Sequence, residues 1–537
     1  MNGLVLQPAP SFSRPVIGEL LRFHAKHRPD KPFLTCGAAS YTYREMDERS
    51  DRVAAGFAGL GVGQGDRVAI LCPNRYEIFE LLFGLAKLGA VQVPLNAYLR
   101  GEFLRHQVAD SGAVALVTDA AGGDAVAPLL AALPDLRVLV ALDESGPGRA
   151  VSFAQVREAA GPAPDVEVQP ADLMSILYTS GTTGLPKGCM LPHGYYVRVG
   201  ELMATSMEQR EDDVLFTALP AFHAVTRMMV TTAALTRGSG VVVEEQFHAS
   251  TFMARAAEVG ATLAYGVGTT GVALLGTPPS PADRAHSLRT FMIGPFTSAQ
   301  QEQFTARFGP DVWVEIFGQT ECVGITWSPV AGPRNRASVG RQSLDLEVTV
   351  LDDDGSPLPD GAVGEICLRP RHRFAMFAGY WRNPQATVDA TAGLWYHTGD
   401  YGKRDSDGFY TFVDRKKDAI RRRGENISSY ELEMAILRHE AVADVAIHGV
   451  PSGSTEDIVM AVVVPAAGCE LDPAAFFAFL REVLPYFAMP RFVRIVGEIP
   501  RNATLRIMKF KLRELPIDDA VWDFEKMGLV IPADARR

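Results

Sequence analysis

Apolar residues recur in the amino-terminal part of this chain with two different periods. Residues 16–27 and 43–60 place them three and four positions apart, which predicts amphipathic helices. Residues 67–71 and 113–118 are short apolar runs bounded by Gly and Asp, a pattern typical of buried parallel strands. Because strand and helix patterns alternate, we expect an α/β fold of layered sheets and helices joined by right-handed crossovers.

The pattern changes toward the carboxyl end. Residues 347–351, 364–368 and 408–413 predict strands separated by turns, and therefore a β-rich subdomain. A compact α+β unit should follow, with helices and strands at residues 429–439, 442–450, 459–464 and 473–483.

The domain boundary is expected at residues 414–417, where the basic run 415–423 begins. We expect a large N-terminal domain, residues 1–416, and a small C-terminal domain, residues 417–537.

Composition narrows the class of protein. The 537 residues, 47% of them apolar, exceed what one hydrophobic core normally contains, so at least two packed units are expected. A formal net charge of −11 argues against nonspecific binding to nucleic acid or anionic membranes. Six cysteines are scattered without CxxC spacing, which indicates reduced thiols in a cytoplasmic protein and no zinc site. The most apolar stretch, residues 81–93, is interrupted by Lys87 and two glycines, so no membrane span is expected.

Residues 178–188 read YTSGTTGLPKG and follow the apolar stretch 174–177. Glycines in such a loop bring backbone N–H groups close to an anion, hydroxyls add donors and a lysine adds charge. The loop differs from that of P-loop NTPases because Pro186 precedes the lysine and Gly188 follows it. It predicts a phosphate-binding site, with a plain surface turn as the alternative. The binding residues would be Thr179, Ser180, Gly181, Thr182, Thr183 and Lys187.

This loop resembles the signature of the adenylate-forming superfamily, which includes acyl-CoA synthetases, luciferases and peptide-synthetase adenylation domains. The superfamily's other motifs recur downstream in the expected order. They are residues 220–223 (PAFH), 317–321 (FGQTE), 395–400 (WYHTGD), 414–418 (DRKKD) and 424–426 (GEN).

The resemblance favours the acyl-CoA synthetase branch of this superfamily. Residues 379–381 (GYW) are similar to the carnitine-type and medium-chain acyl-CoA ligases. The chain also resembles the acyl-CoA synthetases of bacterial diterpenoid pathways. The fold that the resemblance implies is a large domain followed by a small mobile one.

The resemblance implies roles for the residues of these motifs in binding ATP or an acyl-adenylate. Phe317 would stack on adenine, Thr320 would contact a phosphate or carboxylate oxygen, and Glu321 would hold Mg²⁺. Asp400 and Arg415 would bind the ribose. Outside their motif, Phe317 would be interpreted as core packing and Glu321 as a solvated acid.

His223 has two interpretations. A lone histidine in an apolar setting is normally a hydrogen-bonded core residue, whereas the resemblance implies a gate between the acyl pocket and the nucleotide site. The carboxylic acid that enters this pocket is left open by the sequence. The resemblance implies that the pocket is lined by Phe222, His223, Tyr265, Gly266, Gly294, Phe296 and Gly318.

The resemblance further implies that the small domain rotates between two half-reactions about a hinge at Lys417. Gly424 would then line the tunnel for the pantetheine arm of CoA, where a missing side chain leaves room. The basic residues Arg421, Arg422 and Arg423 would meet CoA phosphates, or would form a solvated basic face.

Near the carboxyl end the chain departs from the superfamily's pattern of a glycine followed by a catalytic lysine. Residues 500–513 align without gaps and place Leu505 at the glycine and Arg506 at the lysine. The planar fork of Arg506 keeps the charge but does not fit the slot of a compact ammonium. Loss of such a contact costs about 10²–10³ in rate, so we expect weak adenylation. The alternatives are that Arg506 substitutes adequately, or that Lys509 or Lys511 reaches the site.

Three functions therefore remain open. The chain would transfer an acyl group from a supplied acyl-adenylate to CoA, and would depend on a separate adenylating enzyme. Alternatively, it is a complete ATP-dependent acid–CoA ligase that uses Mg²⁺, or a catalytically silent adenylate-binding regulator. The retained Gly424 and His223 argue against silence. In each case we expect small-molecule ligands and no nucleic acid.

Overall fold

The computed structural model divides into two compact units. Unit 1 comprises Met1–Val348, Leu368–Tyr396 and Asp407–Tyr410, and unit 2 comprises Thr349–Cys367, His397–Ser406 and Thr411–Arg537. The residues that the structure describes are 15–143, 150–158, 163–179, 186–416, 420–422, 425–427, 429–451, 457–484, 488–501 and 507–530. The boundary between residues 416 and 417 stays a prediction.

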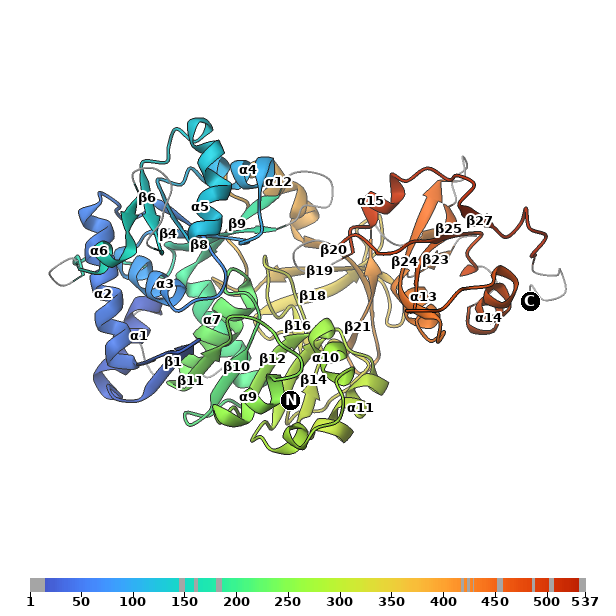
Figure 1. Ribbon diagram of the computed structural model, residues 1–537, viewed down its shortest axis with the longest axis horizontal. Helices are drawn as coiled ribbons and strands as arrows, with labels where there is room; N and C mark the ends of the chain where they lie inside the picture. Colours follow the sequence, from blue (N-terminus) through green and yellow to red (C-terminus); the bar gives the residue numbers. More distant parts are fainter. Residues whose placement is uncertain are drawn as a thin grey trace. The chain divides into compact units, whose positions relative to one another are not determined.

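Two seven-stranded sheets form the centre of unit 1 among the described residues (Figure 1). Neighbouring strands are parallel, except that β2 pairs antiparallel with β1 and β9 pairs antiparallel with β8. The first sheet has the order β14-β13-β12-β10-β11-β1-β2, with β1 (Pro32–Cys36), β2 (Ala39–Thr42), β10 (Val214–Thr217), β11 (Gly240–Val243), β12 (Leu263–Val267), β13 (Thr290–Gly294) and β14 (Asp311–Trp313). The second has the order β7-β6-β5-β3-β4-β8-β9, with β3 (Arg67–Leu71), β4 (Val91–Leu95), β5 (Ala115–Thr118), β6 (Val138–Ala141), β7 (Val151–Ser152), β8 (Leu173–Thr179) and β9 (Lys187–Pro192).

Helices alternate with the strands of both sheets, as the sequence pattern predicted, with the first helix before β1 and the last one after β14. They are α1 (Ile17–His27), α2 (Tyr43–Gly59), α3 (Glu77–Leu88), α4 (Gly101–Ser111), α5 (Ala120–Val126), α6 (Phe153–Arg157), α7 (His193–Ser206), α8 (Ala233–Arg237), α9 (Phe252–Glu258), α10 (Gly268–Leu275), α11 (Ser298–Phe308) and α12 (Pro384–Ala390). A π-helix, η2, spans Val225–Thr232, and short 3₁₀ turns are η1 (Ala127–Ala132), η3 (Pro281–Arg284) and η4 (Ala392–Leu394).

Local sequence explains where several of these helices begin and end. The Thr42 hydroxyl accepts from the Glu45 N–H, and the Glu45 carboxylate accepts from the Thr42 N–H at 2.8 Å, so a capping box starts α2. Gly89 ends α3 with φ of 70°, a left-handed conformation that glycine adopts at no steric cost. The predicted helices at residues 16–27 and 43–60 are confirmed.

The β-rich region between the first and last parts of the chain is also confirmed. A four-stranded sheet, counted over the described residues, has the order β18-β19-β20-β21. Its strands are β18 (Leu346–Leu351), β19 (Gly364–Pro370), β20 (Tyr396–Arg404) and β21 (Tyr410–Arg415). A smaller sheet of unit 1 contains β15 (Ile316–Phe317), β16 (Thr326–Trp327) and β17 (Arg341–Gln342).

The carboxyl-terminal part of unit 2 is the α+β unit that the sequence predicted. Its core packs Val445 and Ile447 of β24 with Val459, Leu480 and Phe476 from the elements that follow. The elements are β22 (Ile420–Arg422), β23 (Glu425–Ile427), α13 (Ser429–Ile436), β24 (Val442–Pro451), β25 (Asp457–Pro465), α14 (Pro473–Val483), β26 (Phe492–Ile495), α15 (Lys509–Arg513) and β27 (Val521–Asp523).

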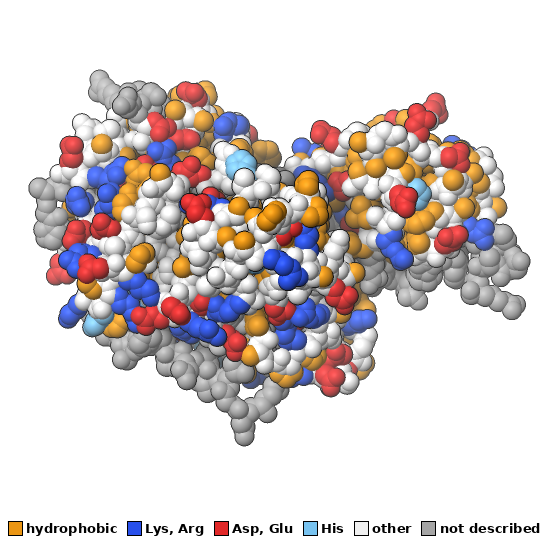
Figure 2. Space-filling view, turned by 60° about the horizontal axis from the view of Figure 1, so that its bottom comes forward, with side chains coloured by type: hydrophobic (Ala, Val, Ile, Leu, Met, Phe, Trp, Pro, Cys, Tyr) orange, Lys and Arg blue, Asp and Glu red, His pale blue; other side chains and the backbone are white. Residues whose placement is uncertain are grey.

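The described surface carries charges of both signs, and the cysteines are free thiols. On the face shown in Figure 2, acidic and basic side chains are interspersed over the described surface. All six cysteines are free thiols, and only Cys469 is exposed. Among the described helices, none is long and apolar enough to cross a bilayer.

Candidate active site

The predicted phosphate loop connects two strands of the second sheet of unit 1. β8 and β9 pair antiparallel, and Thr179 and Lys187 form the pair nearest the loop. Both residues are therefore held at the end of a hairpin whose strands are anchored in the sheet. The other predicted loop residues, Ser180, Gly181, Thr182 and Thr183, lie outside the described residues.

Glu321, the predicted Mg²⁺ ligand, lies beside this hairpin. It is only 7% exposed, and its Oε1 is 3.5 Å from the Thr179 hydroxyl. The Tyr380 hydroxyl donates to the same oxygen at 2.9 Å. The Lys187 ammonium lies 4.8 Å from the centre of the Tyr380 ring, a cation–π distance. Residues from three distant parts of the sequence therefore meet around the carboxylate of Glu321.

Tyr380 is a member of this cluster that the sequence did not single out. Burial and the charge of Glu321 raise the pKa of its hydroxyl, so Tyr380 remains a hydrogen-bond donor. Its backbone N–H donates to the Thr387 hydroxyl at 2.9 Å, which fixes the backbone position from which the Tyr380 side chain extends. Its place in the GYW run was the available signal, but that run pointed only to a family branch.

Replacing Tyr380 by Phe should destabilise unit 1 more than the same change at Tyr396. Tyr380 donates to a buried carboxylate, whereas Tyr396 donates to the neutral amide oxygen of Gln319 at 3.0 Å. We expect a loss of about 1.5–3 kcal/mol for Tyr380→Phe and about 0.5–1.5 kcal/mol for Tyr396→Phe. Urea unfolding followed by tryptophan fluorescence measures both. A loss for Tyr380→Phe that is no larger than the loss for Tyr396→Phe would contradict this prediction.

The remaining residues of the 317–321 motif are fixed by backbone contacts. Phe317 pairs with Thr326 across β15 and β16, and its carbonyl accepts from the Ile325 N–H at 2.8 Å. The Thr320 carbonyl accepts from a buried tyrosine hydroxyl, that of Tyr195, at 3.1 Å. A Cβ at Gly318 would lie 2.6 Å from the Cys322 carbonyl oxygen, so only glycine fits this tight turn.

The loop that carries His223 is held by a side chain from another strand region. The Asn74 amide donates to the Leu219 carbonyl at 3.0 Å and accepts from the Ala221 N–H at 2.6 Å. The Phe222 and His223 rings are 4.6 Å apart, and the π-helix η2 begins two residues later. Such π-turns occur frequently at functional sites. Asn74 was not predicted, although its place just after the buried strand β3 is a position where site residues gather.

The residues predicted to line the acyl pocket lie mainly at the carboxyl ends of β12 and β13. Gly266 is opposite Ile293, and Val267 is opposite Gly294, so the two predicted glycines are on adjacent parallel strands. Tyr265 is fully buried. Phe296 is buried among aromatic side chains of the core, with its ring 6.1 Å from that of Phe304. Lining of an acyl pocket by these residues stays a prediction.

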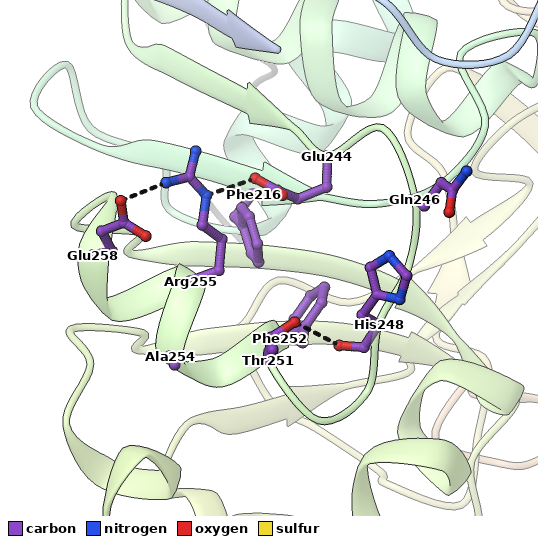
Figure 3. A pocket seen from close by; sticks show the side chains of 9 residues that line it. All are labelled: Phe216, Glu244, Gln246, His248, Thr251, Phe252, Ala254, Arg255 and Glu258. Carbon is purple, nitrogen blue, oxygen red and sulfur yellow. Dashed lines mark hydrogen bonds and ion pairs between the residues drawn. The ribbon is translucent and has the colours of Figure 1, made fainter. Parts of the chain in front are cut away.

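A separate cavity of about 330 Å³ opens at the ends of β10 and β11 (Figure 3). Arg255 lies between Glu244 and Glu258, at 3.0 and 2.8 Å. The cavity is lined by Phe216, Glu244, Gln246, His248, Thr251, Phe252, Ala254, Arg255 and Glu258, so none of the predicted site residues borders it.

In unit 2, the two residues predicted to bind the ribose lie together. Asp400 on β20 is 1% exposed, and its Oδ1 is 3.3 Å from Nε of Arg415 at the end of β21. The buried carboxylate and the half-buried guanidinium therefore orient each other.

The other predicted residues of unit 2 are described in their backbone alone or lie outside the described residues. Arg421 and Arg422 lie on β22, opposite Asn426 and Glu425 of β23, but their side chains are not described. Lys417, Arg423, Gly424, Leu505 and Arg506 lie outside the described residues.

Known proteins resemble this chain over nearly its whole length. Residues 21–381 match the AMP-binding enzyme family, and residues 431–505 match the AMP-binding enzyme C-terminal domain. A crotonobetaine/carnitine–CoA ligase of Salmonella paratyphi A is 33% identical over 485 residues, which cover 88% of this chain and 93% of that protein. A protein of the same name from Citrobacter koseri is 34% identical over 484 residues, with the same coverage.

Solved structures share the fold. The anthranilate CoA ligase AuaEII, in complex with anthranoyl-AMP, superimposes with a TM-score of 0.85 and covers 95% of this chain and 98% of its own. Its 24% sequence identity supports a common fold alone. ATP-bound MatB from Rhodopseudomonas palustris has a TM-score of 0.82 at 28% identity, covering 93% and 98%. The predicted α/β class, with a large domain of sheets and a small second domain, is confirmed.

Proposed function

We propose that this chain, which belongs to the acyl-CoA synthetase branch of the AMP-binding enzyme family, transfers an acyl group from a supplied acyl-adenylate to CoA. Its curated relatives are acid–CoA ligases, and the chain is accordingly an acid–thiol ligase. A separate enzyme would form the acyl-adenylate, and this chain would carry out only the transfer to CoA.

Two half-reactions are needed because a carboxylate does not react directly with a thiol. The leaving group in such a reaction would be an oxide dianion. Transfer of AMP to the acid gives a mixed anhydride with a good leaving group, which the thiol of CoA then attacks. Related structures hold ATP or an acyl-adenylate, so a binding site for either ligand is consistent with the family. Mg²⁺ would be held by Glu321 if adenylation occurs.

The observation that carries the proposal is the position of Lys509. Its ammonium donates to the Ser429 hydroxyl at 2.5 Å and pairs with Glu433 at 2.8 Å, and both ion-pair side chains are 11% exposed. Glu433 also accepts from the Ile447 N–H at 2.8 Å. Lys509 is therefore an internal ion-pair partner of unit 2, which supports the proposal that it does not take the place of the lysine that the family resemblance expects at position 506.

The other roles follow the family. Thr179, Lys187, Phe317, Thr320, Glu321, Asp400 and Arg415 would hold the acyl-adenylate, His223 would act as the gate, and Gly424 would admit the thiol arm. We further propose that residues 417–537 rotate as a mobile domain about Lys417. The chain is similar both to crotonobetaine/carnitine–CoA ligases and to an anthranilate CoA ligase, whose acids differ, so these similarities do not identify the acyl group.

A paired assay tests the proposed function. Purified protein is given either a set of acids with ATP, Mg²⁺ and CoA, or the matching synthetic acyl-adenylates with CoA, and thioesters are measured by mass spectrometry. We expect products only in the second arm. Products in both arms would identify a complete ATP-dependent ligase. Binding of an acyl-adenylate by calorimetry, without any thioester, would identify a silent regulator.

Replacing Lys509 by Met should reduce stability without reducing pyrophosphate exchange. Burial already raises the pKa of Glu433, and removal of its partner leaves a buried carboxyl uncompensated. We expect a loss of about 3–5 kcal/mol in unfolding free energy.

Lys511→Met is the matched control, because Lys511 is exposed on the same helix and its loss should cost little. Any residual acid-dependent pyrophosphate exchange should be the same in both variants. If exchange disappears in folded Lys509→Met and persists in Lys511→Met, Lys509 is the catalytic lysine and the proposal is wrong.

A further inference from the structure

Three side chains with metal-binding atoms meet on two neighbouring strands of unit 2. Glu365 and Cys367 are two positions apart on β19, and His397 is on the adjacent strand β20. One ligand atom from each residue lies within 4.8 Å of the other two. Glu365 and Cys367 are buried, and His397 is partly exposed.

We propose that Glu365, Cys367 and His397 form a site for a divalent cation of the Zn²⁺ class. Thiolate, imidazole and carboxylate are the ligands that Zn²⁺ takes in proteins. The family resemblance assigns none of the three residues to nucleotide, acid or CoA, although His397 lies within the motif at residues 395–400. It is also distinct from the Mg²⁺ site predicted at Glu321, which belongs to unit 1.

The distances suit a tetrahedral ion. Bonds of about 2.0 Å to nitrogen or oxygen and about 2.3 Å to sulfur separate neighbouring ligand atoms by about 3.3–3.5 Å. The His397 Nδ1 is 3.0 Å from the Glu365 Oε2 and 3.4 Å from the Cys367 Sγ. These two edges therefore lie within a few tenths of an ångström of the required values, and the third, between Glu365 and Cys367, is within 4.8 Å. Water would supply the fourth ligand.

The carboxylate is already oriented for this role. The Gly399 N–H donates to Oε1 of Glu365 at 2.9 Å, which leaves Oε2 directed toward His397. Such outer contacts fix a ligand's orientation in metal sites. The His397 side chain is 28% exposed, so the site is not sealed from solvent.

The Lys416 ammonium pairs with Glu365 and would compete with a cation for that carboxylate. Lys416 has a second ion-pair partner, Asp353, so it can give up the contact with Glu365. Its ammonium is 3.1 Å from Oε2 of Glu365 and 3.1 Å from Oδ1 of Asp353. When the cation binds, Cys367 loses its thiol proton to solvent, and the two charges of the ion balance Glu365 and the thiolate. Lys416 then remains paired with Asp353, so the local charge stays balanced.

Affinity should increase with pH. The Cys367 thiol must lose its proton when it binds the ion, so binding is favoured at higher pH.

Cobalt titration tests the site in the full-length protein. Co²⁺ is added under reducing conditions after removal of metals, and the near-ultraviolet charge-transfer band of a cobalt–thiolate bond is followed. We expect saturation at one ion per chain. Cys367→Ser should abolish the band, and His397→Gln should weaken binding by more than roughly tenfold. Lys416→Met should strengthen binding, because it removes the competing ammonium.

Cys469→Ser is the matched control, since Cys469 is the exposed thiol of the chain and the one most accessible to an adventitious ion. Its loss should leave the band and the stoichiometry unchanged. The proposal is overturned if wild type gives no cobalt–thiolate band at millimolar Co²⁺, or if the band survives Cys367→Ala, which keeps the strand's packing. Loss of the band in Cys469→Ser would likewise overturn it.

Discussion

Changing Leu505 to Gly together with Arg506 to Lys is expected to raise acid-dependent pyrophosphate exchange by about 10²–10³, the value of one charged contact to a transition state. Glycine at 505 restores backbone freedom that a Cβ restricts. Lysine at 506 restores a compact ammonium where a planar guanidinium stands. Exchange of labelled pyrophosphate into ATP, measured in the presence of the acid, gives the rate directly.

The control variants separate charge from backbone. Arg506→Lys alone should recover only part of the rate, and Lys511→Arg, a charge-conserving change on an exposed residue, should recover none. Thioester formation from supplied acyl-adenylate should change little in any variant, because that half-reaction uses the other catalytic face. Robust exchange by the unmodified protein would falsify the divided reaction and leave an ordinary ATP-dependent ligase.

Replacing Gly424 by Leu is expected to reduce thioester formation from acyl-adenylate by on the order of 10², the cost of displacing a reacting group by about an ångström. The added side chain would occupy the proposed path of the pantetheine arm. The loss should appear in the KM for CoA or in kcat, while the affinity for the acyl-adenylate stays unchanged in calorimetry.

Gly497→Leu is the matched control in unit 2. A Cβ at Gly497 meets no atom within 4 Å, so the same added volume should be harmless there. If Gly424→Leu loses acyl-adenylate binding and thioester formation equally, Gly424 is a structural position and the tunnel assignment is wrong.

Most elements of the fold could be predicted because their causes are local. The capping box of Thr42 and Glu45 and the apolar period of residues 43–60 lie within one stretch of chain. The predicted strands at residues 67–71 and 113–118 correspond to β3 and β5, which pair in parallel. The order of strands in the sheets had no such local cause, because pairing between β1 and β11 joins residues far apart in sequence.

The candidate site divides in the same way. The sequence alone determined the phosphate loop, the motif residues Glu321, Asp400 and Arg415, and the departure at Leu505 and Arg506, since each is a residue type at a fixed place in a short run. Their roles in catalysis remain predictions.

Only the tertiary structure decided which side chains share a carboxylate and which potential metal ligands lie together. Tyr380 meets Glu321 across 59 residues, Lys509 of α15 pairs with Glu433 of α13, and Cys367 lies beside His397. Cysteine spacing argued against zinc because it detects ligands that are neighbours in sequence, whereas strand pairing brings together residues thirty positions apart. Hydrogen bonds and ion pairs act over a few ångströms, so partners distant in sequence are fixed by the fold and not by the pattern of residues around each one.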